Sequence, residues 1–200
     1  MSSLPESILL IDRHPSMASA WRDCFGNDDV FEVVEGDYFS RPADAMLSPA
    51  NSFGIMDGGL DAAIRDTLGG NIQRSVQRVI LDECHGEMPV GQAAVVATSN
   101  DKWPFLVVAP TMRVPESVAR TTHAYLAFRA ALLAVQRFNA ASSSTTIRSL
   151  VCCGLGTGIG AMDFTRCATQ MYMAYRQLAG PARIPSFRQI HETHGALVRS

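Results

Sequence analysis

The sequence predicts a three-layer α/β/α sandwich around a mixed, largely parallel central sheet. The first observation behind this prediction is a series of short apolar runs, such as Ile8–Ile11 and Phe105–Ala109. The second is that amphipathic helical patterns alternate with these runs. Strands that are apolar throughout are covered on both faces, so the alternation indicates a parallel sheet with helices on each side.

Each expected strand is a run of apolar or β-branched residues bounded by turn residues. In chain order, the expected strands are Ile8–Ile11, Phe31–Val34, Ala45–Pro49, Ala93–Ala97, Phe105–Ala109 and Ile147–Cys153.

Each expected helix gathers its apolar side chains on one face, at intervals of three or four residues. Gly69-Gly70 should end the second helix, and Asp163 should cap the N-terminus of the last. In chain order, the expected helices are Ser16–Phe25, Leu60–Leu68, Ile72–Cys84, Ala124–Val135 and Phe164–Tyr175.

One domain is expected over residues 1–180, because a chain of 200 residues can bury one sizeable core but is short for two. Residues 181–200 contain Pro181 and Pro185 and show no helical periodicity. We therefore predict that they form a C-terminal tail or a docking segment.

Composition excludes several classes of protein. A hydrophobic fraction of 47% and a charged fraction of 18% argue against disorder, and a net charge of −2 without a basic patch argues against duplex DNA binding. Met1–Glu6 lacks the start of a signal peptide, and the most apolar helix, Ala124–Val135, is too short to span a membrane. A cytoplasmic protein without membrane contact is expected.

The cysteines and histidines point to neither redox chemistry nor metal binding. The five cysteines show no C-x-x-C spacing, which favours reduced, buried thiols. His191 and His194 lie in the predicted tail without flanking ligand residues. No metal and no cofactor are therefore expected, and nothing in the sequence specifies an oligomeric state.

The segment Ser48–Asp61 is the first candidate binding loop. It joins an expected strand to an expected helix and places Asn51, the pair Gly58-Gly59 and Asp61 on that connection. Glycines at the start of a helix let a ligand approach free backbone N–H groups. Both side chains also have a purely structural interpretation. A carboxylate such as Asp61 is favourable in the first turn of any helix, and Asn51 could simply stabilise a turn.

The segment Gly154–Gly160 is the second candidate loop, again between an expected strand and an expected helix. Its four glycines at alternate positions expose backbone N–H groups, and Thr157 adds a hydroxyl. Two such loops at the strand ends of one open α/β sheet converge on a single crevice. A diphosphate fits that crevice, although the glycines could instead serve close helix packing.

A dinucleotide-binding fingerprint is the rival interpretation, because Gly156, Gly158 and Ala161 satisfy G-x-G-x-x-A. The acidic partner of that fingerprint should lie about twenty residues further on. No Asp or Glu occurs between Asp163 and Glu192, so a dehydrogenase is disfavoured.

Five short motifs follow one another along the chain: Gly36-Asp37, Ser48-Pro-Ala-Asn51, Asp57-Gly-Gly-Leu-Asp61, Val107–Thr111 and Gly156-Thr-Gly-Ile159. In this order and spacing they resemble motifs of macrodomains, which bind ADP-ribose and related metabolites. The similarity covers residues 31–178 and leaves the strand and helix of residues 8–26 as an addition before the family core.

The resemblance implies a role for each matching residue. Asp37 would accept a hydrogen bond from the adenine amino group, although it could also be a simple turn residue. Asn51 would orient the distal ribose, and Asp61 would position or activate water in members that hydrolyse. Eight further residues would surround the distal ribose and the diphosphate with their backbone: Gly58, Gly59, Leu60, Gly156, Thr157, Gly158, Ile159 and Gly160.

The resemblance also has departures. Gly160 stands where the family carries an aromatic residue beside the distal ribose. Met56 and Asp57 stand where hydrolytic members have more glycine, and Thr111–Pro115 is unusual, with Arg113 placed where it could reach the ligand.

The function implied is binding of ADP-ribose or a derivative, with hydrolysis of an ADP-ribosyl linkage through Asp61 and Asn51. The partner would be ADP-ribose or an ADP-ribosylated substrate, and nucleic acid would enter only as such a substrate. A non-catalytic ADP-ribose reader is the first alternative, and a binder of another nucleotide in the same crevice is the second.

Overall fold

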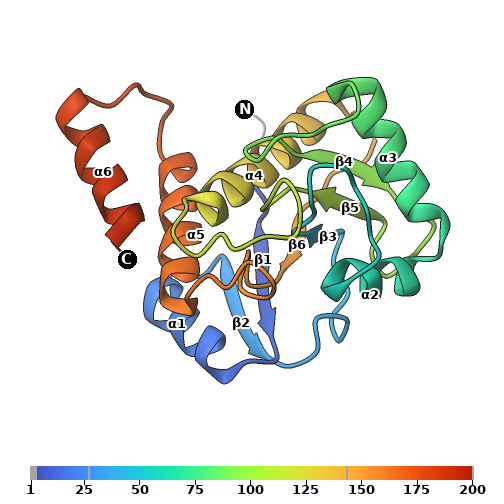
Figure 1. Cartoon of the computed structure of the whole chain (residues 1–200), viewed down its shortest axis with the longest axis horizontal. Helices are drawn as coiled ribbons and strands as arrows, with labels where there is room; N and C mark the ends of the chain where they lie inside the picture. Colours follow the sequence, from blue (N-terminus) through green and yellow to red (C-terminus); the bar gives the residue numbers. More distant parts are fainter. Residues whose placement is uncertain (1–3, 27, 143, 200) are drawn as a thin grey trace.

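The computed structural model describes residues 4–26, 28–142 and 144–199, and its strands form one sheet between two helical layers (Figure 1). The strand order is β2-β1-β6-β3-β5-β4, in which β4 runs antiparallel to β5 and the other neighbours are parallel. The predicted fold class is confirmed. The strands are β1 Ser7–Asp12, β2 Phe31–Glu35, β3 Ala45–Ser48, β4 Ala94–Ala97, β5 Phe105–Val108 and β6 Ser149–Cys152.

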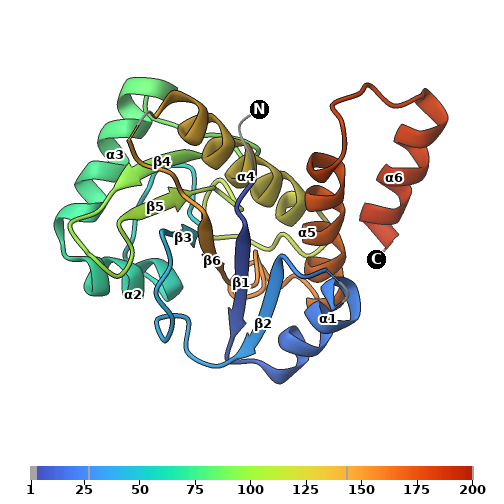
Figure 2. The ribbon, with the colours of Figure 1, turned by 180° about the vertical axis from the view of Figure 1, so that it is seen from behind.

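Helices α1 to α5 divide between the two faces of the sheet, and α6 lies beyond α5 (Figures 1 and 2). On one side α5 packs against both α1 and α4, and on the other α2 and α3 pack together over β3 and β4. The five expected helices are all present, with ends that shift by a few residues. The helices are α1 Pro15–Phe25, α2 Gly59–Leu68, α3 Asn71–Cys84, α4 His123–Ala141, α5 Phe164–Ala179 and α6 Phe187–Arg199.

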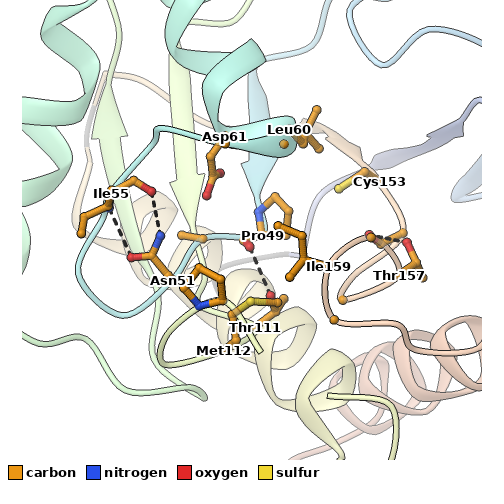
Figure 3. A pocket seen from close by; sticks show the side chains of 18 of the residues that line it. Pro49, Asn51, Ile55, Leu60, Asp61, Thr111, Met112, Cys153, Thr157 and Ile159 are labelled. Atoms are coloured by element: carbon orange, nitrogen blue, oxygen red, sulfur yellow. Dashed lines mark hydrogen bonds between the residues drawn. The ribbon is translucent and has the colours of Figure 1, made fainter. Parts of the chain in front are cut away.

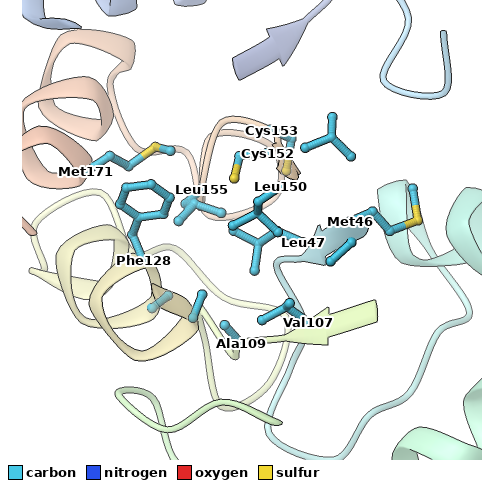
Figure 4. Packing of buried hydrophobic residues seen from close by; sticks show 14 of the residues in the cluster. Met46, Leu47, Val107, Ala109, Phe128, Leu150, Cys152, Cys153, Leu155 and Met171 are labelled. Carbon is cyan, nitrogen blue, oxygen red and sulfur yellow. The ribbon is translucent and has the colours of Figure 1, made fainter. Parts of the chain in front are cut away.

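The core lies between the central strands and these helices. Successive strand residues point to opposite faces, so Leu47 and Leu150 face Phe128 of α4 and Met171 of α5, while Met46 lies on the other side (Figure 4). All five of these side chains are buried. Because the strands are apolar on both faces, their side chains are buried against the helices on each side of the sheet. The uninterrupted apolar runs in the sequence predicted this arrangement.

The cysteines are free thiols, as expected, but Cys24 and Cys84 are only half-buried. Cys152, Cys153 and Cys167 are buried, and burial raises the pKa of each thiol well above its ordinary value. Since the thiolate is the reactive form, these three residues act as packing groups.

The segment predicted to be a tail contains α6. The two prolines, Pro181 and Pro185, precede this helix rather than interrupt it. Leu197 is buried, and its carbonyl oxygen accepts a hydrogen bond from Nε2 of Gln170 on α5 (3.1 Å). The prediction of no helical periodicity was wrong, because Phe187, Ile190 and Leu197 recur at helical spacing along α6. Residues 1–3 of the predicted domain and Ser200 lie outside the described part of the chain.

The added strand β1 lies inside the sheet. It pairs with β2 on one side, with Ile8 opposite Phe31, and with β6 on the other, with Ser7 opposite Ser149. The carboxyl ends of β1, β6, β3 and β5 therefore meet at the same edge of the sheet, where the following loops form the candidate site.

The capping role predicted for Asp163 is confirmed. Its carboxylate accepts hydrogen bonds from the backbone N–H of Thr165 (2.9 Å) and of Arg166 (3.1 Å) at the start of α5. Two donors that have no partner within the helix are thereby satisfied.

We expect Asp163→Ala to lower the free energy of unfolding by about 1 kcal/mol, the usual cost of losing an N-cap side chain. Urea denaturation followed by circular dichroism would measure it. Asp163→Asn keeps a capping oxygen and should cost far less, whereas equal losses for both variants would contradict the capping role.

Candidate functional site

A cavity of about 470 Å³ opens at the edge where the four strand ends meet. Figure 3 shows Asn51, Asp61, Thr111 and Ile159 arranged around it. Its walls come from four segments that are distant in sequence. These are Asp12–His14, Pro49–Asp61, Thr111–Pro115 and Cys153–Gly160.

The first wall is the start of α2, where Gly58 and Gly59 leave the backbone open. A Cβ atom added at either glycine would meet no atom within 4 Å. Gly59 also has a φ of +56°, in the left-handed region that favours glycine. Free N–H groups of the first helical turn and the positive end of the helix dipole therefore face the cavity, which suits an anion.

Asp61 projects from the first turn of α2 toward the cavity (Figure 3). Its Oδ1 accepts a hydrogen bond of 2.5 Å from Oγ of Ser48 at the end of β3. Burial raises the pKa of Asp61 from 3.8 to about 6, while the Ser48 hydroxyl acts in the opposite direction. Asp61 is therefore mostly ionised at neutral pH, with a proton affinity suited to a general base.

Asn51 lines the cavity, but its side chain also holds its own loop together. Nδ2 donates to the carbonyl of Ile55 (2.7 Å), and Oδ1 accepts from the backbone N–H of Phe53 (3.1 Å) and of Ile55 (3.3 Å). An amide nitrogen carries two hydrogens, so a second N–H can still be offered to a ligand. The turn role of Asn51 is therefore observed, and one N–H stays available for the predicted ligand role.

The second glycine loop forms the opposite wall. The N–H of Met162 donates to the carbonyl of Gly156 (3.0 Å), whose φ is +73°, and Oγ1 of Thr157 donates to the carbonyl of Gly154 (3.2 Å). Gly158 is open to the cavity, since an added Cβ would meet nothing within 4 Å. The Thr157 hydroxyl therefore shapes the loop, and backbone N–H groups are left to face a ligand.

Gly160 has a structural reason to be glycine. An added Cβ would lie 2.5 Å from the carbonyl oxygen of Gly156 and 2.6 Å from Cγ2 of Val118. The N–H of Val118 also donates to the carbonyl of Gly160 (2.7 Å). The aromatic side chain that the family carries at this position is excluded here, because the segment after β5 packs against the loop.

Asp37 is the one predicted site residue that the structure does not bring to the cavity. It follows the edge strand β2, its carboxylate pairs with Arg13 (3.0 Å), and it accepts a hydrogen bond from the N–H of Phe39 (3.3 Å). The Phe39 bond is the main reason that the pKa of Asp37 is lowered. The edge strand β2, which precedes Asp37, lies outside β1, and β1 is the outermost strand whose end lines the cavity.

Asp12, which the sequence did not reveal, stands at the end of β1 and lines the cavity. Its Oδ2 accepts from the N–H of Gly154 (3.4 Å), and its Oδ1 from the N–H of His14 (2.9 Å). Asp12 thus joins the β1 loop to the second glycine loop. No pattern in the sequence places β1 between β2 and β6, so Asp12 could not be selected over Asp37.

Arg113 lies at the mouth of the cavity, as the sequence suggested. Its Nε and Nη2 donate to the two carboxylate oxygens of Glu87 (2.7 and 3.0 Å). Its guanidinium carbon stands 5.2 Å from the ring centroid of Phe53, which also lines the cavity. The Glu87 pairing holds the cation in place over the ring and leaves the arginine at the rim.

Two properties of the described residues concern metal ligands and membrane-spanning helices. Within the ranges 4–26, 28–142 and 144–199, no three His, Cys, Asp or Glu side chains cluster in a way that could hold a metal ion. No helix in the same ranges has the length and hydropathy needed to cross a membrane.

Comparison with known proteins identifies the family. The Macro domain model matches residues 47–171, which include both glycine loops. The chain belongs to the Macro domain family. This family binds ADP-ribose, and the resemblance inferred from the sequence motifs is confirmed.

The chain is also similar to other proteins and solved structures over most of its length. A protein of Aeropyrum pernix is 29% identical over 153 residues, covering 76% of this chain and 74% of its own. An Oceanobacillus iheyensis macrodomain variant with ADP-ribose superposes with a TM-score of 0.62 at 14% identity, over 98% of this chain and 94% of that one. The macrodomain of Mycobacterium tuberculosis DarG superposes with a TM-score of 0.58 at 18% identity, over 72% of this chain and 88% of that one. These two solved structures share the fold of this chain.

Proposed function

We propose that the cavity binds ADP-ribose and that the protein hydrolyses an ADP-ribosyl linkage. The observation that carries this proposal is the placement of Asp61. Its carboxylate is fixed by Ser48, lines the cavity and lies beside the open start of α2. Family membership supports the ligand, and the carboxylate beside an anion-binding helix start supports the chemistry.

The diphosphate would lie between the two glycine loops. Backbone N–H groups of Gly58–Leu60 and Gly156–Ile159 would bind its oxygens, with each contact to the helix start worth about 0.3–1 kcal/mol. The open positions at Gly58, Gly59 and Gly158 allow this close approach. Binding would thus depend on the backbone more than on basic side chains.

The adenine would lie at the β1 end of the cavity. The Asp12 carboxylate is positioned there to accept a hydrogen bond from the exocyclic amino group. The resemblance assigned this contact to Asp37, which the structure keeps away from the cavity in an ion pair with Arg13. We therefore assign the adenine contact to Asp12.

The reaction would take place at the anomeric carbon of the distal ribose. Asn51 would orient the ribose hydroxyls, and Asp61 would accept a proton from the attacking water. As the new C–O bond forms, the bond to the modified group breaks and its electron pair leaves with that group. Holding water and ribose in line can supply roughly 7–11 kcal/mol of the barrier reduction in favourable cases.

A non-catalytic reader is the second candidate, and two observations favour it. The Asn51 amide already makes three hydrogen bonds within its loop, and Gly160 leaves no room for the family's aromatic residue. Both features would weaken binding of the distal ribose while leaving the diphosphate loops intact.

The cytoplasmic location also stays a prediction.

The test is release of free ADP-ribose from a panel carrying the modification on acidic side chains, on nucleobases and on small molecules. We expect release from at least one class, and loss of that release in Asp61→Ala. Asp66→Ala, on the same helix and paired with Arg65, is the matched control and should retain activity. ADP-ribose binding without release from any class would establish a reader. Tighter binding of another nucleotide than of ADP-ribose would overturn the ligand assignment.

A further inference from the structure

Ser48 is a buried hydroxyl that the family resemblance leaves without a role. It is the last residue of β3, 1% exposed, and its carbonyl accepts from the N–H of Ala109 (3.1 Å) in the neighbouring chain segment. Its backbone is therefore fixed by the sheet. Its Oγ reaches across to the first turn of α2 and donates to Oδ1 of Asp61.

This bond joins two elements that are otherwise connected by a glycine-containing loop. Between Ser48 and Asp61 the chain passes through Gly54, Gly58 and Gly59, two of which have positive φ. The Asn51 side chain and the N–H of Met56, which donates to Oε1 of Gln73 (2.9 Å), hold this loop, but these bonds do not involve the Asp61 side chain. The Ser48 hydroxyl links the Asp61 carboxylate directly to the central sheet.

We propose that Ser48 is a positioning residue for Asp61, holding Oδ1 so that Oδ2 faces the cavity as the proton acceptor. The inference rests on the proposed function for its catalytic consequence. Its geometric part, which is the fixed orientation of the carboxylate, can be tested without any substrate.

The surroundings of Asp61 leave this task to Ser48. Tyr38 and Cys153 are the ionisable groups buried near it, and burial raises the pKa of both, so that they are neutral at physiological pH. The nearest cation on its own helix, Arg65, pairs with Asp57 and Asp66 instead. Among the described residues Asp61 forms no ion pair, and the Ser48 hydroxyl is what favours its charged form.

Removing the hydroxyl should therefore change the titration of Asp61 and not only its packing. In Ser48→Ala, we expect the midpoint of Asp61 titration to move up by about one pH unit, since a hydrogen bond to a charged group is lost. Carboxyl ¹³C NMR of the labelled protein, with Asp61→Asn used to assign the signal, measures this directly. Ser48→Thr keeps a hydroxyl and should restore the wild-type midpoint.

Ser52→Ala is the matched control, because Ser52 is equally buried, at 1% exposed, in the same loop. It should leave the Asp61 titration unchanged. Thermal unfolding of all variants identifies any that fail to fold. If Ser48→Ala folds and its Asp61 titration matches the wild type, the positioning role is overturned.

The catalytic consequence is tested on whichever substrate releases ADP-ribose. We expect Ser48→Ala to lower kcat about tenfold with little change in KM, and to move the acid limb of the pH profile upward together with the NMR midpoint. An unchanged kcat alongside a moved NMR midpoint would overturn the catalytic part. If no substrate is hydrolysed, the proposed function fails, while the NMR result still decides whether Ser48 orients Asp61.

Discussion

Asp61→Asn is expected to abolish release of ADP-ribose while making the folded protein more stable at pH 8. The loss of activity follows because an amide cannot accept the proton of the attacking water. A reduction of at least about 100-fold is expected for loss of a general base. The gain in stability follows because the charged carboxylate is held in a partly buried site that disfavours charge.

The sign of the stability change depends on pH. Folding raises the pKa of Asp61 from 3.8 to about 6, so the folded protein binds this proton more tightly than the unfolded chain does. The contribution of Asp61 to stability is fully present below pH 3.8 and is lost as the pH rises through 6. Asparagine is neutral throughout, so its advantage over aspartate appears only at the higher pH.

The size of this advantage is at most about 3 kcal/mol, from a pKa raised by roughly two. For a chain of this length that corresponds to a rise in Tm of at most roughly 6–12 °C at pH 8. The side-chain amide oxygen in Asp61→Asn can still accept the hydrogen bond from Ser48, so that contact is kept. Thermal unfolding at pH 8 and at pH 4 measures the effect. A Tm at pH 8 that falls, or rises equally at pH 4, would contradict the account.

Gly158→Asp is expected to weaken ADP-ribose binding by at least about 100-fold. Gly158 lines the cavity, has no positive φ, and an added Cβ would meet nothing within 4 Å. The variant should therefore fold and place a carboxylate where the diphosphate would lie. Like charges brought together at a binding site cost several kcal/mol, and about 2.7 kcal/mol corresponds to a 100-fold change.

Gly180→Asp is the matched control for Gly158→Asp. Gly180 also leaves open space around an added Cβ and has a negative φ of −90°, but it follows α5 away from this cavity. Its variant should bind ADP-ribose as the wild type does. Calorimetry or fluorescence polarisation would compare the three proteins, and a Gly158→Asp affinity within about threefold of wild type would place the diphosphate elsewhere.

Local patterns in the sequence predicted the secondary structure and most of the residues that were then found to line the cavity. Apolar runs such as Ile8–Ile11 identify strands because burial on both faces admits few other residues. Asp163 was recognised because an N-cap is a contact between neighbours in sequence. The two glycine loops were recognised for the same reason, since open backbone at a helix start is a local property.

Contacts set by the tertiary fold could not be predicted in this way. Sheet order decides that Asp12 reaches the cavity and that Asp37 does not, and order follows from long-range packing. The Arg113–Glu87 pair joins residues 26 positions apart, and Ser48 contacts Asp61 across a loop. α6 was not predicted because its apolar residues follow Pro181 and Pro185, which indicated an irregular segment.

Calorimetric titration with ADP-ribose tests the central claim most directly, using the wild type, Asp12→Asn and Asp37→Asn. The account predicts saturable binding with one site per chain in the wild type. Asp12→Asn should weaken it about tenfold or more, as expected for a hydrogen bond to a charged group, while Asp37→Asn should stay within about twofold of wild type. No saturable heat in the folded wild type, or a loss confined to Asp37→Asn, would contradict the account.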